Sequence, residues 1–232
     1  MRPIAIVSDI AGTTSSTRFI KDVLDVYAEQ FLPDFIREHK DERDVSRQLR
    51  SMSDKVGVNF RKTEQLIEHL LDWMRDDKKV PELLTLQGMV WEQGYEQGEY
   101  QAHVYADVPE RLQQWRDDEI NLYTFSSASE RAQRLYFRFT SQGDLRLMFA
   151  GYFDHTIGPK QAVASYQGLA DGVALRTEQM LYISNSEGEL DAAAEAGMQT
   201  IRVEREEETG NAPEDVKSSH TVVSSFSDII ID

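Results

Sequence analysis

The sequence has no cysteine among its 232 residues, so disulfide bonds and thiol chemistry are excluded. A chain without cysteine fits a reducing compartment, where disulfides are rare. The sequence also lacks an apolar run long enough to span a membrane, and a basic segment followed by an apolar one at its N-terminus. We therefore expect a cytoplasmic protein that has no membrane partner.

Positive charge is scarce. The chain has 25 Lys and Arg against 41 Asp and Glu, which gives a formal net charge of −16. Nucleic acids and anionic membranes bind clustered cations, so we expect neither as a partner. We also expect a monomer. An anionic substrate would need local cations, a metal ion or backbone amides. We interpret the acidic run Glu204–Glu208 as a solvated loop.

Two kinds of hydrophobic pattern divide the chain. Apolar residues at helical spacing fill residues 15–103, whereas residues 104–232 alternate short strand patterns with helical ones. Strands that alternate with helices predict a parallel sheet. We therefore predict the α/β class: a Rossmann-like parallel-sheet core formed by residues 1–14 and 104–232, with residues 15–103 inserted as a helical domain.

The first strand pattern ends in polar residues. The run Ile4–Val7 is typical of a strand buried on both faces, and Asp9, Gly12, Thr13 and Thr14 follow it. Ligands in open α/β sheets bind beyond the carboxyl ends of the strands, where glycine lets the backbone approach closely. A strand followed by an Asp-Gly turn and a helix cap explains the same residues. This stretch alone leaves both interpretations open.

Polar residues also end two later strands. Ser126 and Ser127 follow one strand pattern, Asn185 follows another, and Lys160 opens a helix. We expect Asp9 to be exposed at its strand end and all of these groups to face one edge of the sheet. A carboxylate, hydroxyls and an ammonium group suit phosphoryl transfer, in which Asp9 attacks phosphorus while Mg²⁺ and Lys160 offset the phosphate charge.

The ordered motifs resemble those of a known superfamily. SDIAGTT, FSS, Gly158-Pro159-Lys160 and SNSEGELDAA are similar to the four motifs of the haloacid dehalogenase superfamily, in which a helical insertion forms a mobile cap. LQGMVWEQGYEQGE from Leu86, AGYFDHTIGPK from Ala150 and ELDAAAEAGMQT from Glu189 further resemble acireductone synthase, the enolase-phosphatase of methionine salvage.

The resemblance implies a hydrolase, a Mg²⁺-dependent phosphatase of methionine biosynthesis. Its small phosphorylated substrate would be 2,3-diketo-5-methylthiopentyl 1-phosphate, and its product acireductone. Residues 15–103 would be the cap domain. Asp9 and Lys160 would be catalytic, and phosphate would be bound by Ser126, Ser127, Thr13 and Lys160. The metal ligands would be Asp9, the backbone carbonyl of Ala11, and Asn185.

The chain departs from the family pattern at two of these positions and at a third in the phosphate loop. Ala11 stands where the family has a Glu that serves as acid and base, and Asn185 stands where it has a metal-binding Asp. Ala128 replaces a glycine, which predicts crowding in the phosphate loop; of the nearby acids, Glu187, Glu189 or Asp191 could assist the metal. Two alternatives follow: a catalytically impaired homologue that binds a phosphorylated ligand, or a phosphatase of altered substrate choice.

Overall fold

A computed structural model of the chain describes residues 2–209 and 217–231. The chain divides into two compact units. The first, the core unit, comprises Met1–Phe19 and Gln101–Asp232, and the second, the helical unit, comprises Ile20–Tyr100. The assignment of residues 15–103 as a cap remains a prediction from the sequence.

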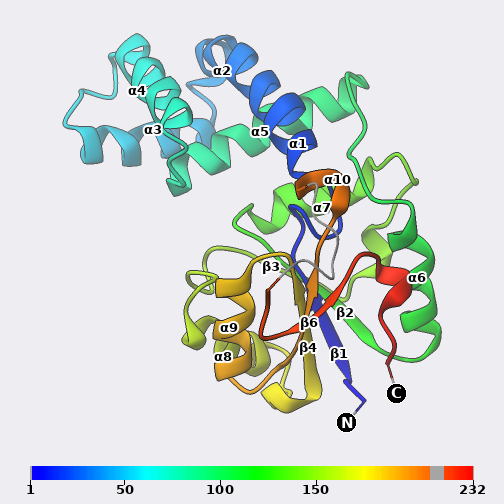
Figure 1. Cartoon of the computed structure of the whole chain (residues 1–232). Helices are drawn as coiled ribbons and strands as arrows, with labels where there is room; N and C mark the ends of the chain where they lie inside the picture. Colours follow the sequence, from blue (N-terminus) through cyan, green and yellow to red (C-terminus); the bar gives the residue numbers. More distant parts are fainter. Residues whose placement is uncertain (1, 210–216, 232) are drawn as a thin grey trace. The chain divides into compact units, whose positions relative to one another are not determined.

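The core unit is built on a parallel six-stranded sheet with the order β3-β2-β1-β4-β5-β6 (Figure 1). This confirms the predicted α/β class. The first strand of the chain lies inside the sheet, paired with β2 and β4. The strands are β1 (Ala5–Ser8), β2 (Asn121–Phe125), β3 (Gly151–Phe153), β4 (Met180–Ser184), β5 (Gln199–Val203) and β6 (Thr221–Val223).

Helices cover both faces of the sheet, so the side chains of β1 are buried whichever face they point to. All of its residues are buried, and Ala5 and Val7 share one apolar cluster with Leu169 of α8 and Leu190 of α9. Helix α6 covers the opposite face and contacts β2 (Figure 1). The helices of the core unit are α1 (Thr17–Phe19), α6 (Asp107–Asp117), α7 (Glu130–Arg138), α8 (Val163–Gly172), α9 (Glu187–Glu195) and α10 (Glu206–Thr209), with 3₁₀ turns η2 (Arg146–Met148), η3 (Thr177–Gln179) and η5 (Phe226–Asp228).

In the helical unit, whose residues the structure describes throughout, every regular element is a helix, as the periodicity predicts. Its apolar stripes meet in one core that contains Leu32, Leu49 and Leu70. Pro81 starts α5, where its missing N–H removes no helical hydrogen bond. The elements are the π-helix η1 (Ile20–Asp25), α2 (Val26–His39), α3 (Arg43–Val56), α4 (Thr63–Arg75) and α5 (Pro81–Gln97).

One edge of the sheet was not predicted from the sequence. Strand β3 has three residues, which is too short for a recognisable alternation of apolar and polar side chains. At the other edge, β6 is equally short, with three residues. Among the described helices, none has the length and apolar character needed to cross a membrane.

The packing of α9 against the sheet gives a test of the core. Leu190 is 0% exposed, whereas Leu147 is 81% exposed. We expect Leu190→Ala to lower the free energy of unfolding by about 2–5 kcal/mol, because it removes apolar contacts and leaves a cavity. Urea denaturation measures the loss. The same substitution at Leu147 should change stability by less than about 0.5 kcal/mol, and equal losses would contradict this packing.

Candidate functional site

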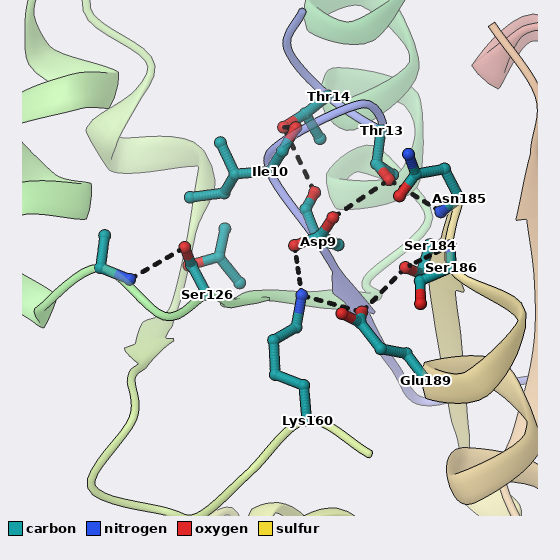
Figure 2. A network of polar contacts seen from close by, with 12 residues as sticks. Asp9, Ile10, Thr13, Thr14, Ser126, Lys160, Ser184, Asn185, Ser186 and Glu189 are labelled. Atoms are coloured by element: carbon teal, nitrogen blue, oxygen red, sulfur yellow. Dashed lines mark hydrogen bonds and ion pairs between the residues drawn. The ribbon is translucent and has the colours of Figure 1, made fainter. Parts of the chain in front are cut away.

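The carboxyl ends of three neighbouring strands bring the predicted site residues together. Ser8 is in register with Thr124 of β2 and Ile183 of β4. Asp9, Ser126 and Asn185 therefore follow their strands at the same edge of the sheet. Figure 2 shows Asp9 between Lys160 and the Thr13–Thr14 loop. This arrangement matches the convergence expected from the sequence.

Asp9 is buried rather than exposed. Only 5% of its surface is accessible, so the expectation of an exposed strand-end carboxylate was wrong. Its amide N–H donates to the Ile183 carbonyl at 2.9 Å, and the following residues fold back over the strand end. The amides of Thr13, Thr14 and Ser15 all donate to the Ile10 carbonyl, at 3.2, 3.1 and 2.9 Å. This tight turn encloses the carboxylate.

Lys160 joins two buried carboxylates. Its Nζ lies 2.5 Å from Asp9 Oδ1 and 2.8 Å from Glu189 Oε2. Burial alone would lower the pKa of Lys160, but the carboxylates outweigh it and raise that pKa. Burial raises the pKa of Asp9, Lys160 offsets part of the effect, and Glu189 raises it again. With both acids ionised, the three groups carry an excess negative charge, which favours a further cation.

Lys160 is held by the backbone just before α8 and does not open a helix as expected. The Tyr166 hydroxyl donates to the Lys160 carbonyl at 2.7 Å, and the Ser165 hydroxyl donates to the Pro159 carbonyl at 2.7 Å. Gly158 has a φ of +135°, and a Cβ there would lie 2.5 Å from Ser165 Oγ. The glycine-proline sequence before Lys160 therefore fits a turn that a larger residue could not form.

Glu189 belongs to this site, although the sequence marked it only as one of three acids that could assist the metal. Its Oε2 accepts hydrogen bonds from the hydroxyls of Tyr182 at 2.8 Å and Ser184 at 2.9 Å, besides pairing with Lys160. The other two acids, Glu187 and Asp191, lie apart from it. Together with His220 they form a separate group on α9 and the segment before β6.

Thr13 connects Asp9 to Asn185. Its hydroxyl donates to Asp9 Oδ2 at 3.4 Å and accepts from the Asn185 backbone N–H at 3.1 Å. Gly12, with a φ of +77°, lies directly against the Asn185 side chain: a Cβ there would be 2.9 Å from Asn185 Cγ. Glycine is therefore required here both by the backbone conformation and by the close approach of Asn185.

The predicted phosphate loop, residues 126–129, connects β2 to α7. The Ser126 hydroxyl accepts from the Ala128 amide at 3.2 Å, while Ser127 is exposed. Buried Gln133 donates to the carbonyls of Ala128 and Phe153, each at 2.8 Å, and accepts from the Thr124 hydroxyl at 2.6 Å. Ala128 has no positive φ, so its backbone does not require glycine. Gln133 was not predicted, since nothing in a helical pattern marks a buried amide.

The donor atoms near Asp9 are compatible with Mg²⁺. Asp9, the Ala11 carbonyl and Asn185 all offer oxygen, the donor that this hard cation prefers. The excess negative charge of the Asp9, Lys160 and Glu189 group supports the same conclusion. However, only Asp9 among the three expected ligands is charged, so the site suits a weakly bound ion.

Comparison with known proteins adds to this geometry. The chain is 42% identical over 228 residues to enolase-phosphatase E1 of Pseudomonas aeruginosa strain LESB58, a match that covers 98% of each chain. The chain belongs to the enolase-phosphatase E1 family. The family member from Alcanivorax borkumensis is 40% identical over 225 residues, with 97% of each chain covered. A scan against protein-family models found no match.

Solved structures agree with the family fold. The UTR4 protein of Saccharomyces cerevisiae has a TM-score of 0.78 and 30% identity, covering 98% of this chain and all of that one (100%). A HAD phosphatase from Thermococcus onnurineus has a TM-score of 0.58 at 16% identity, covering 98% of this chain and 95% of that one; it shows the shared fold alone.

The acidic run after β5 also departs from expectation. Glu204 is 3% exposed and pairs with Arg202 at 3.1 Å, so it is not solvated. Glu206 and Glu207 are exposed as expected, but they lie in α10 rather than in a loop. Arg205 is buried like Glu204, and the Glu208 carboxylate accepts from the Tyr105 hydroxyl at 2.8 Å. Neighbouring cations and hydroxyls satisfy these charges, a pairing that a local charge pattern does not reveal.

Gly12 provides a test of the loop that follows β1, residues 10–15, with Gly57 as a matched control. Both have positive φ, but a Cβ at Gly57 would meet nothing within 4 Å. We expect Gly57→Ala to cost about 1–2 kcal/mol of backbone strain. Gly12→Ala should cost more, because the methyl group must also displace Asn185. Denaturant unfolding of both variants measures the difference, and equal losses would contradict the contact.

Proposed function

We propose that the protein is an enolase-phosphatase, which converts 2,3-diketo-5-methylthiopentyl 1-phosphate to acireductone in methionine salvage. The observation that carries the proposal is the buried Asp9–Lys160 pair at the carboxyl edge of the sheet, in a chain 42% identical to a named enolase-phosphatase E1. A phosphatase of this kind acts on a small phosphorylated molecule. We keep the cytoplasmic location and the monomeric state as predictions.

In this proposal each group has a separate role. Asp9 is the nucleophile that attacks phosphorus, and Lys160 offsets the negative charge of the phosphate. Ser126, Ser127 and Thr13 bind phosphate oxygens. The short distance between Lys160 and Asp9 supports this assignment, because the ammonium group favours the ionised carboxylate and offsets part of the rise in the Asp9 pKa that burial causes.

Mg²⁺ is part of the proposal. Its ligands in this chain would be Asp9, the Ala11 carbonyl and Asn185. Bound there, the ion would neutralise charge on the phosphate. The side chains of this chain would still bind and orient the phosphate.

Ala11 limits the reaction in our proposal. Breakdown of an aspartyl phosphate needs a base to activate water, and the methyl group of Ala11 cannot serve as one. An enolate leaving group is less basic than a simple alkoxide, so attack by Asp9 should suffer less than hydrolysis of the intermediate. The second candidate, a homologue that binds a phosphorylated ligand but turns it over poorly, rests on this same residue.

Restoring the acid decides between these two candidates. We expect Ala11→Glu to raise turnover of the diketo phosphate by about 10²-fold, within the range of one acid–base group. Phosphate release at saturating Mg²⁺ is the measurement, and intact mass should show phosphoenzyme in the unmodified chain. Asp9→Asn in the Ala11→Glu protein is the control and should abolish release. Unchanged turnover in a folded, saturated Ala11→Glu protein would place the acid–base group elsewhere.

A separate experiment examines the metal. Asn185→Asp adds a full negative charge beside the expected ion, so we expect it to bind Mg²⁺ about tenfold or more tightly than the unmodified chain. Calorimetric titration without substrate gives both affinities. Asn185→Ala, which removes the ligand oxygen, should bind more weakly than either. Equal affinities for the unmodified chain and the Asn185→Asp variant would show that residue 185 is not a ligand.

A further inference from the structure

A buried arginine beyond the recognised motifs contacts the loop at residues 10–16, which we call the catalytic loop because it follows the proposed nucleophile Asp9. Arg205 follows β5 and is 7% exposed. Its Nη2 and Nε both donate to the Thr13 carbonyl, at 2.9 and 3.2 Å. Thr13 is fully buried. A buried carbonyl needs a hydrogen-bond partner, and here the guanidinium supplies one with two N–H groups.

The contacted residue is the one that links Asp9 to Asn185. The Thr13 hydroxyl donates to Asp9 Oδ2 at 3.4 Å and accepts from the Asn185 amide at 3.1 Å. A shift of the Thr13 backbone would therefore move the hydroxyl away from both residues. Arg205 is therefore connected to the Asp9 carboxylate, which we propose as nucleophile, through a single intervening residue, Thr13.

Arg205 is itself fixed from the opposite side. Its Nη1 pairs with Asp107 Oδ2 at 2.8 Å and donates to the Ser224 carbonyl at 3.3 Å. The same Asp107 oxygen accepts from the Phe226 amide at 2.6 Å and the Ser225 hydroxyl at 2.8 Å. These contacts tie residues 224–226, the start of α6 and the catalytic loop to one guanidinium.

Aromatic rings set the plane of the guanidinium. Arg205 Cζ lies 4.1 Å from the centroid of the Tyr105 ring and 5.4 Å from that of Phe226. The Tyr105 amide also donates to the Thr14 carbonyl at 3.1 Å, next to the carbonyl that Arg205 holds. A planar fork stacked on rings has little freedom to rotate, and lysine cannot reproduce it.

We propose that Arg205 is a positioning residue for the catalytic loop: through the Thr13 carbonyl it fixes the hydroxyl that orients Asp9, and Asp107 holds the guanidinium in place. The catalytic consequence rests on the proposed function of Asp9. The ordering of the loop does not, so the two are tested by separate measurements.

Hydrogen exchange of the loop amides is the first measurement, on the full-length unmodified chain. The amides of Thr13, Thr14 and Ser15 bond within the loop, so their exchange reports its opening. We expect Arg205→Lys to accelerate exchange in peptides covering residues 10–16 by about tenfold or more, because a charge-assisted contact to Thr13 is lost. Exchange in β4 should stay unchanged.

Arg202→Lys is the matched control. Arg202 lies on β5, is ion-paired like Arg205, but contacts Glu187 at 2.7 Å and Glu204 at 3.1 Å instead. The Arg202→Lys substitution should leave hydrogen exchange in the peptides covering residues 10–16 unchanged. If both variants behave alike, or if Arg205→Lys accelerates exchange uniformly across the sheet, Arg205 is only structural and the proposal is overturned. Should Arg205→Lys fail to fold, Asp107→Asn weakens the ion pair that holds the guanidinium in place and should loosen the same peptides.

Kinetics is the second measurement, in the Ala11→Glu background where turnover is expected to be high. We expect Arg205→Lys to lower kcat by about 10²-fold with KM changed little, as for a misplaced reacting group. If kcat is unchanged while exchange at residues 10–16 is accelerated, Arg205 orders the loop but does not affect catalysis, and the catalytic part of the proposal is overturned. If Ala11→Glu itself shows no phosphatase activity, the proposed function fails, and the exchange result still decides whether Arg205 orders the loop.

Discussion

The site depends on a charge imbalance at the end of one buried strand. Asp9 and Glu189 share a single ammonium group, that of Lys160, in a place that water hardly reaches. Buried charges without partners are costly, and each of these groups has one: Glu189 accepts from two hydroxyls, Asp9 accepts from the Thr13 hydroxyl, and Lys160 donates to both carboxylates. The local fold can be understood as the means of keeping these three groups together.

The uncharged residues at positions 11 and 185 affect this balance in one direction. A chain with Glu at position 11 and Asp at position 185 would carry two more negative charges on the segments that surround Asp9. A bound cation would stabilise such a site more than it stabilises this one. Ala11 and Asn185 therefore belong together electrostatically: each reduces the repulsion that a metal would otherwise have to offset.

The sequence predicted the features that depend on local patterns of residues. The apolar run before Asp9, the alternation of strands and helices and the four ordered motifs indicated the fold class, and strand topology placed Asp9, Ser126 and Asn185 at one edge. It did not predict that Asp9 is buried, because burial depends on how residues 10–15 fold back over it. Gln133 and Arg205 were missed, and Glu189 was not distinguished from its neighbours, for a related reason: their partners are distant in the chain or are backbone carbonyls, which no side-chain pattern records.

The position of β1 inside the sheet has a consequence for folding. Ala5 pairs with both Asn121 and Met180, so the strand that carries Asp9 must wait for partners that come much later in the chain. Residues 20–100, whose contacts are local and helical, can assemble before either pairing exists. Closing such long loops is slow, and until it happens β1 is an apolar edge open to other chains. The rate at which β2 and β4 reach β1 should therefore set the balance between folding and aggregation for this protein.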